Sequence, residues 1–291
     1  MNAIEIRNLT KAFGDKVALT GLDMTVPEGA IYGFIGENGS GKSTTEKIIA
    51  GLIPATSGTV KLFGKDHTDA DIRAKISVLI EAPGCFPGCT VFDNMMLGAA
   101  NLGIENAEYE VVRALKAVRM EGAAGNKYKN CSLGMKQRVG IAMALLGNPV
   151  LLILDEPING LDADGMRIMR EILTDITKNY GATVLVSSHI LGELEKIATH
   201  YGIIKGGRML REMTAEELAA SCPTYTAVKV GDTSRAKAHL ALKYSRVEEE
   251  DGCIRIYGAN TPEEIVVFLY ENGFTPSEVV TRRISLEEYY L

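Results

Sequence analysis

The stretch GENGSGKST, residues 36–44, decides the fold of this 291-residue chain. It fits the pattern G-x-x-x-x-G-K-[ST], follows the apolar run AIYGFIG and opens the helical pattern KSTTEKIIAGL. Glycines let backbone N–H groups wrap phosphate oxygens, and the helix N-terminus adds partial positive charge. A chance glycine-rich turn is the alternative, but it would not explain the strand and the helix on either side. We expect a phosphate-binding loop formed by Gly36, Asn38, Gly39, Ser40, Gly41, Lys42, Ser43 and Thr44.

Two side chains of this loop have predicted roles in binding a nucleotide with its metal ion. Lys42 is expected to reach the β- and γ-phosphates, and the Ser43 hydroxyl is expected to ligate Mg²⁺.

A second motif, LLILDEP at residues 151–157, places two acids at the end of a buried strand. Open α/β sheets bind their ligands at the carboxyl ends of such strands. Asp155 suits an outer contact to Mg²⁺, and Glu156 suits a general base that orients and deprotonates the attacking water. Alone, two acids after a strand would mark an ordinary strand–loop boundary; beside a phosphate-binding loop they favour a hydrolytic site.

The run TVLVSSH, residues 183–189, ends another apolar strand, which we expect at the same sheet edge. His189 is suited to hydrogen-bond a γ-phosphate and hold the nucleophilic water. A lone histidine is more often structural, so the run by itself leaves both roles open.

The segment CSLGMKQR, residues 131–138, opens a helix that could hold a second anion. Ser132 can act as the N-cap, and Gly134 leaves the backbone exposed. Two phosphate-binding helix starts for one nucleotide predict a head-to-tail pair of chains, in which each chain completes the other's site.

Alternating apolar runs and helical patterns predict an α/β domain over residues 1–220. Residues from about 85 to 146 show helical patterns without a convincing strand, which predicts a helical subdomain inserted into that core. The pattern restarts over 221–291 and predicts a small α/β appendage. Within the appendage, the acidic run EEED (248–251) is expected to be a solvated loop, and SLEEYYL (285–291) is expected to start a short helix.

Composition argues against nucleic acid and against a membrane span. The net charge is −6, and acidic residues outnumber basic ones both before and after residue 220, so neither part offers a basic face. The longest apolar stretch, VGIAMALLG at 139–147, is far short of the roughly 20 residues that a span needs. The five cysteines lack a partner set for a metal, and we expect reduced thiols.

In this order, the motifs resemble those of the ATP-binding subunit of an ABC transporter, over residues 1 to about 220. Residues 36–44 resemble the Walker A loop, LLILDEP the Walker B strand, NGLD with Asp162 the D-loop, and His189 the switch histidine. The resemblance implies ATP and Mg²⁺ as cofactors, ATP hydrolysis and a P-loop fold. It also implies that Phe13 stacks on adenine, although Phe13 is otherwise an ordinary apolar residue.

This chain departs from the family pattern at two places. CSLGMKQR differs from the usual Leu-Ser-Gly-Gly-Gln signature, but it keeps Ser132 and Gly134, which the resemblance places against the γ-phosphate bound by the opposite subunit. Glu81, at the end of the strand KISVLI, stands where the family usually has a glutamine that touches Mg²⁺ and follows the membrane partner. Glu81 is therefore a candidate metal ligand and coupling residue.

Glu81, together with SLGMKQR, NGLD, SSHILGELE and SLEEYYL, resembles the ATPases of bacitracin-resistance and lantibiotic-immunity exporters. That resemblance implies a cytoplasmic subunit on the inner face of the membrane, paired with a second ATP-binding subunit and a multi-span permease. Homodimer and heterodimer both stay open. The alternatives are a soluble ABC ATPase that acts on nucleic acid or ribosomes and a regulatory module that signals without turnover. One cassette, an acidic charge balance and the intact Glu156 weigh against them.

Overall fold

The computed structural model describes the chain except for residues 82, 190, 222, 251, 259–260 and 285–291. The chain divides into two compact units: Met1–Ala215, here the core unit, and Glu216–Leu291, here the C-terminal unit. This division falls slightly before the expected boundary at residue 220. The helix expected for residues 285–291 lies outside the described residues.

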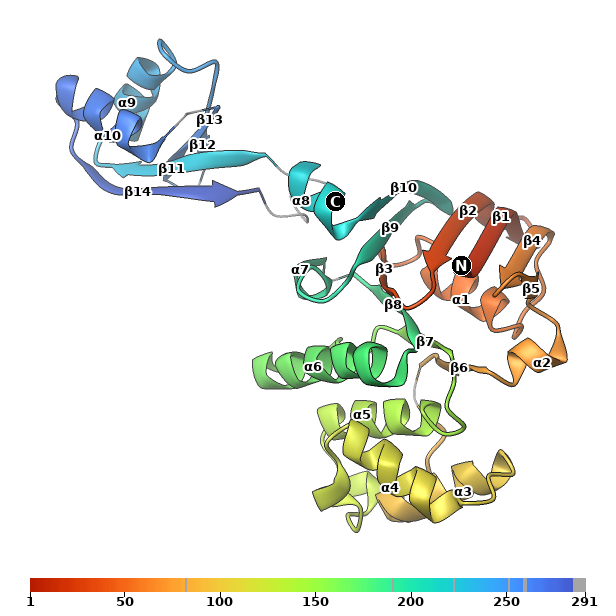
Figure 1. Ribbon diagram of the computed structural model, residues 1–291. Helices are drawn as coiled ribbons and strands as arrows, with labels where there is room; N and C mark the ends of the chain where they lie inside the picture. The colour runs from red at the N-terminus through yellow and green to blue at the C-terminus, as the bar shows by residue number, and fades with distance from the viewer. Residues whose placement is uncertain (82, 190, 222, 251, 259–260, 285–291) are drawn as a thin grey trace. The chain divides into compact units, whose positions relative to one another are not determined.

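A six-stranded sheet forms the centre of the core unit (Figure 1). All neighbouring strands are parallel except the edge pair β9–β10. Most residues of β3, β7 and β8 are buried, which explains their continuous apolar runs, since parallel strands are covered on both faces. In spatial order the strands are β10 (Arg208–Thr214), β9 (His200–Lys205), β3 (Ile31–Ile35), β8 (Thr183–Ser188), β7 (Leu151–Asp155) and β6 (Ile76–Leu79).

A second, antiparallel sheet packs beside helix α1 (Lys42–Ile49). Ile48 and Ile49 of α1 share one buried cluster with residues of both sheets, so the helix that follows the phosphate loop is fixed from two sides. A short helix, α2 (Ala70–Arg73), follows this sheet. In spatial order the strands are β2 (Lys16–Pro27), β1 (Asn2–Phe13), β4 (Ser57–Leu62) and β5 (Lys65–Asp66).

Residues 85–146 form three helices, α3 (Val91–Asn101), α4 (Ala107–Ala117) and α5 (Leu133–Ala144), which lie together in Figure 1. Short 3₁₀ turns at Glu121–Ala123 and Tyr128–Asn130 join α4 to α5, and this stretch contains no strand longer than an isolated bridge. Helix α6 (Ala163–Tyr180) follows β7, and its buried residues recur at helical spacing along one face. The predicted α/β core with an inserted helical segment is confirmed.

After helix α8, the described residues of the C-terminal unit follow the order βαββαβ, with all neighbouring strands antiparallel. Its strand order, β12-β13-β11-β14, is that of a ferredoxin-like sheet. Val228, Ile254 and Ile265 belong to its core between sheet and helices. The elements are β11 (Thr224–Val230), α9 (Thr233–Leu240), β12 (Arg246–Glu250), β13 (Cys253–Tyr257), α10 (Pro262–Glu271) and β14 (Pro276–Arg283).

The prediction that 248–251 form a solvated loop is wrong for Glu248–Glu250, which belong to strand β12, and residue 251 lies outside the described residues. Val247 packs against the core, while Glu248 pairs with Arg246 at 2.8 Å. Charged residues are common on an edge strand because they discourage pairing with another chain, and this masks the strand in the sequence. The helix expected from ILGELEKIA is also shorter than predicted, since α7 covers only Leu191–Leu194; helix α8 covers Ala215–Ser221.

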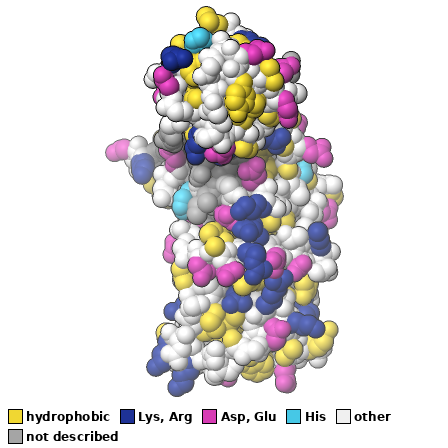
Figure 2. Space-filling model, turned by 90° about the vertical axis from the view of Figure 1, so that its left-hand side faces the viewer, with side chains coloured by type: hydrophobic (Ala, Val, Ile, Leu, Met, Phe, Trp, Pro, Cys, Tyr) yellow, Lys and Arg dark blue, Asp and Glu magenta, His cyan; other side chains and the backbone are white. Residues whose placement is uncertain are grey.

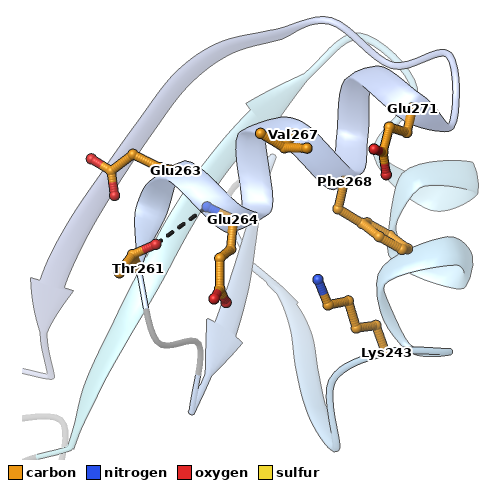
Figure 3. Close-up of a pocket in the computed structure, with 7 residues that line it drawn as sticks. All are labelled: Lys243, Thr261, Glu263, Glu264, Val267, Phe268 and Glu271. Carbon is orange, nitrogen blue, oxygen red and sulfur yellow. Dashed lines mark hydrogen bonds between the residues drawn. The ribbon is translucent and has the colours of Figure 1, made fainter.

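A hollow of about 340 Å³ lies on the C-terminal unit between Lys243 and α10 (Figure 3). The Thr261 hydroxyl accepts a hydrogen bond from the backbone N–H of Glu264, and Glu263 and Glu264 sit in the first turn of α10. Acidic residues stabilise a helix start through its dipole, so this cluster is explained by helix stability.

Candidate active site

The loop between β3 and α1 has the backbone of an anion cradle. Gly39 and Gly41 have φ values of 82° and 115°, which are accessible to glycine and strained for other residues. A Cβ at Gly36 would collide with the carbonyl oxygen of Ile204 and the hydroxyl of Ser40. The glycines are therefore required by the loop geometry.

Lys42 is buried at the start of α1, with 5% of its surface exposed. Its Nζ donates hydrogen bonds to the carbonyl oxygens of Gly36 (2.5 Å) and Glu37 (3.2 Å). Nζ also lies 3.6 Å from Oε1 of Glu156. The loop thus holds a fixed cation above its own backbone, next to the end of β7.

Asp155 and Glu156 are brought to this cation by strand β7. Ser187 at the end of β8 contacts both acids. Its hydroxyl donates a hydrogen bond to Oδ1 of Asp155 (2.7 Å), and the backbone N–H of Glu156 donates to both the hydroxyl oxygen and the carbonyl oxygen of Ser187. Glu156 has φ +49°, a conformation that is uncommon for a residue with a Cβ. Such strain concentrates at functional sites, where the surrounding structure imposes it.

His189 completes the cluster, because its Nδ1 lies 2.8 Å from Oε2 of Glu156. One carboxylate thus contacts the imidazole through one oxygen and faces Lys42 with the other. Oε1 of Glu156 is buried and has no hydrogen-bond partner within the described part of the chain. This geometry suits a base that takes a proton from a water molecule held beside it.

A cavity of about 520 Å³ lies over this cluster, a volume typical of small-molecule sites. The expected residues Gly36, Ser40 and His189 lie outside its lining. Ser40 is buried, and its hydroxyl has no hydrogen-bond partner among the described residues. Phe13 lies at the cavity with 49% of its surface exposed, so its ring is accessible to a ligand. The expected residues that line the cavity are Phe13, Asn38, Gly39, Gly41, Lys42, Ser43, Thr44, Asp155 and Glu156.

Sequence reasoning missed the other lining residues, Lys16–Ala18 and Gly206–Gly207. Lys16–Ala18 start β2, directly after the hairpin turn that follows Phe13. Gly207 closes the turn between β9 and β10, and its N–H donates to the carbonyl oxygen of Ser40 at 2.9 Å. The sequence offered one signal for these residues, because the cationic Lys16 follows the aromatic Phe13 by three positions.

Three further expected residues, Ser132, Gly134 and Asp162, line a separate hollow of about 420 Å³ together with their neighbours. Ser132 caps α5 by accepting from the N–H of Met135 (3.3 Å), and Asp162 caps α6 by accepting from the N–H of Gly165 (2.8 Å). Within one chain, Ser132, Gly134 and Asp162 therefore lie beside one another but do not reach the first cavity.

Glu81 does not line either hollow. Its carboxylate pairs with Nζ of Lys47 at 3.1 Å, and 76% of its side chain is exposed. Its φ of +68° makes a sharp turn at the end of β6. In this position the Glu81 carboxylate therefore does not make the expected contact with Mg²⁺.

Comparison with known proteins identifies the family. The family described as ABC transporter matches residues 19–159. The chain is 35% identical over 297 residues to a bacitracin transport ATP-binding protein, BcrA of Bacillus licheniformis, covering 99% of this chain and 96% of that protein. The chain belongs to the ABC transporter family.

Two further matches place this ABC protein among ATP-binding subunits. It is 40% identical over 209 residues to a lantibiotic transport ATP-binding protein, SrtF of Streptococcus pyogenes, covering 72% of this chain and 90% of that protein. The solved structure of CbiO1 of Clostridium perfringens, part of an ABC transporter complex, superposes with a TM-score of 0.70 at 26% identity. That match covers 76% of this chain and 91% of CbiO1. The predicted family, ABC ATPase fold and ATPase activity are confirmed.

Among the described residues, no helix has the length and apolar character to cross a membrane.

Figure 2 shows Lys and Arg side chains gathered in one band of the face that it views, with Asp and Glu side chains among them. In a hollow along α6, arginines are likewise paired with acids: Arg119 pairs with Glu171, and Arg170 pairs with Glu193.

The ABC site also fits Mg²⁺, which usually binds through one or two protein ligands, phosphates and its own waters. The Ser43 hydroxyl and the Asp155 carboxylate line one cavity, and the buried unpartnered oxygen of Glu156 lies at the same end of β7. Over the described ranges, no group of three or more His, Cys, Asp or Glu residues forms a site that would hold a metal by protein ligands alone.

One further acid at this ABC site, Glu46, was missed by sequence reasoning. It lies on α1 with 0% of its surface exposed, and burial, followed by repulsion from Asp155, raises the pKa of its carboxyl to about 8. Its position was readable from the helix, because Glu46 lies among the buried positions Thr45, Ile48 and Ile49 of KSTTEKII.

Proposed function

We propose that this chain is the Mg²⁺-dependent ATPase subunit of an exporter of bacitracin-type or lantibiotic-type antimicrobial peptides. The observation that carries the catalytic part is the Glu156 carboxylate, held between Nδ1 of His189 and Nζ of Lys42 at the cavity that the phosphate loop lines.

In this proposal, Glu156 accepts the proton of the attacking water while His189 fixes the carboxylate and contacts the γ-phosphate. Lys42 exchanges its carbonyl contacts for phosphate oxygens and offsets the charge that develops on them. Ser43 and Asp155 hold Mg²⁺, which supplies charge neutralisation at the phosphates. Phe13, with half of its surface exposed, stacks on the adenine.

The second hollow supports a head-to-tail pair of chains. Ser132 and Asp162 each cap the N-terminus of a long helix, and both helix starts face one hollow that the phosphate loop of the same chain does not reach. Helix N-termini attract anions. A partner chain would bring its γ-phosphate to Ser132 and Gly134, so that two sites form at one interface.

The proposed export substrate and partner rest on the relatives. The match to the bacitracin transport protein covers nearly the whole of both chains, so it includes the C-terminal unit. In this proposal the chain acts with a separate multi-span permease, as such ATP-binding subunits do, and lies at the cytoplasmic face of the membrane. Glu81 remains proposed as the residue that couples the two and contacts Mg²⁺ once its side chain leaves Lys47.

The test is expression of the chain with a candidate multi-span permease from the same genome, followed by growth in bacitracin and in a lantibiotic. We expect the pair to co-purify from detergent and to raise resistance to one of these peptides. The Glu156→Gln variant should still co-purify with the permease, but cells that express this pair should gain no resistance. Equal resistance from both pairs would contradict transport powered at this site, and RNA in stoichiometric amounts on the purified chain would contradict the transporter assignment.

A further inference from the structure

Strand β14 forms one edge of the sheet in the C-terminal unit, and among the described residues no strand pairs with its outer side (Figure 1). It is eight residues long, and its inner side pairs with β11 from Pro276 to Arg283. Ser277 and the stretch Val280–Arg283 are exposed. A long edge strand presents backbone N–H and C=O groups that another strand can pair with.

The side chains of β14 alternate between the two faces of the sheet. Val279 packs against the core between sheet and helices and lies opposite Val228 of β11. Glu278, Val280 and Arg282 therefore lie together on the other face. Val280 has 41% of its surface exposed, and the side chains of Glu278 and Arg282 are 39% and 53% exposed. Along this face the edge reads acid, apolar, base.

This order of side chains is complementary to itself. If two copies of β14 pair antiparallel about Val280, then Val280 faces Val280, and Glu278 of each copy faces Arg282 of the other. Opposite charges across a strand pair stabilise it, and like charges destabilise it. A register centred on Glu278 or on Arg282 would oppose like charges. The side chains thus favour a second copy of this chain in one register.

The ion pairs that these residues make within one chain do not prevent such pairing. Glu278 pairs with Arg282 at 3.2 Å and with Lys229 of β11 at 3.3 Å, and all three side chains are exposed by more than a third. Exposed ion pairs contribute little to stability, so the exchange of one for an equivalent pair between chains costs little.

The opposite edge of the same sheet lacks this property. Strand β12 is five residues long and carries the acids Glu248, Glu249 and Glu250. Pairing two copies of β12 over its full length would oppose Glu248 with itself, which destabilises the pair. Of the two edges, β14 is therefore the one suited to a second copy.

We propose that two copies of this chain associate by antiparallel pairing of β14 about Val280, which joins two four-stranded sheets into one of eight strands. This interface is separate from the head-to-tail pairing proposed at the ATP sites, and it requires no nucleotide. A pair of edge strands is smaller than a typical stable interface, so the association of the free chain should be weak and should depend on its concentration.

The test is sedimentation velocity on the full-length chain in EDTA without nucleotide, over a concentration series that yields the dimer Kd. Glu278→Arg and Arg282→Glu should each raise this Kd about tenfold or more, because each opposes like charges twice. An equimolar mixture of the two variants should restore the Kd to within about threefold, because opposite charges then face each other across the pair. The ion pair between positions 278 and 282 within one chain stays broken in both variants, so this recovery would require contact between chains.

A monomeric unmodified chain would overturn the inference, and it is the result expected if a strand of a different protein pairs with β14. An unchanged Kd in the single variants, or a mixture that stays as weak as they are, would also overturn it. Should these variants not fold, Val280→Cys should form a disulfide-linked dimer on mild oxidation, and Ser277→Cys, which would face Arg283 of the other copy, should not. Equal linking in the two variants, or none in Val280→Cys, would contradict the pairing. Loss of ATP-driven dimers alone would count against the proposed function and not against this interface.

Discussion

Oε2 of Glu156 lies 2.8 Å from Nδ1 of His189, across the ends of strands β7 and β8. The two residues are 33 positions apart in sequence, and the parallel pairing of the two strands aligns them, with Asp155 opposite Ser187. The contact between the two side chains means that His189 holds the Glu156 carboxylate in one orientation. The acid and the histidine should therefore affect turnover together, and neither should be needed for nucleotide to bind.

His189→Ala should lower kcat by about a hundredfold, because the base loses its orienting partner and the γ-phosphate loses a donor. The Kd for ATP should change by less than about threefold, since the phosphate loop is untouched. Phosphate release and equilibrium binding on the same preparation measure both. A loss confined to affinity would contradict the role of His189.

Lys42→Ala should weaken binding of Mg²⁺-ATP by about tenfold to a hundredfold, because a charge-assisted contact to phosphate is lost. Lys47→Ala is the matched control on the same helix, as Lys47 is partly exposed and pairs with Glu81 instead of the loop. Fluorescence titration with an ATP analogue compares the two. Equal affinities for the two variants would contradict the placement of Lys42 at the phosphates.

Gly134→Ala tests the contribution of a second chain. A Cβ at this position would meet only Leu161 at 3.5 Å, an ordinary contact, so the variant should unfold at the temperature of the unmodified protein. It should keep ATP affinity and lose about tenfold or more in kcat, because the added methyl group would block the partner's γ-phosphate. Full turnover would indicate that this hollow does not take part in hydrolysis.

Glu81→Gln tests coupling to the permease. The Glu81–Lys47 ion pair is exposed and contributes at most about 1 kcal/mol, so the free energy of unfolding should hardly change. With the permease present, Glu81→Gln should change the peptide resistance obtained per ATP hydrolysed, while Lys47→Gln, which keeps the carboxylate, should not. If both variants behaved alike, the ion pair and not the carboxylate would be responsible.

The residues of the nucleotide site could be predicted from the sequence because their spacing is local. A loop from Gly36 to Thr44 between a strand and a helix has few alternative structures, and the acids after β7 must emerge at the same sheet edge. Gly206 and Gly207 reach the cavity through the long-range packing of the turn between β9 and β10, which no local pattern encodes, whereas the only local signal for Lys16 was its spacing from Phe13.

Other misses have different physical causes. Glu248–Glu250 resemble a loop because an edge strand tolerates charge on its exposed side. The side-chain direction of Glu81 depends on its positive φ and on the nearby Lys47, and neither is visible in a run of letters. Glu46 was visible as an acid at buried helical spacing, but its neighbours come from two other strands.

The most direct test of the account is the turnover of Glu156→Gln measured beside its nucleotide affinity. The amide keeps the size of the side chain but cannot take a proton, so kcat should fall by about a thousandfold while the Kd for Mg²⁺-ATP stays unchanged. ATP should then hold the variant as a stable dimer on size-exclusion chromatography. Undiminished turnover in this variant would contradict Glu156 as the base and the hydrolytic site built around it.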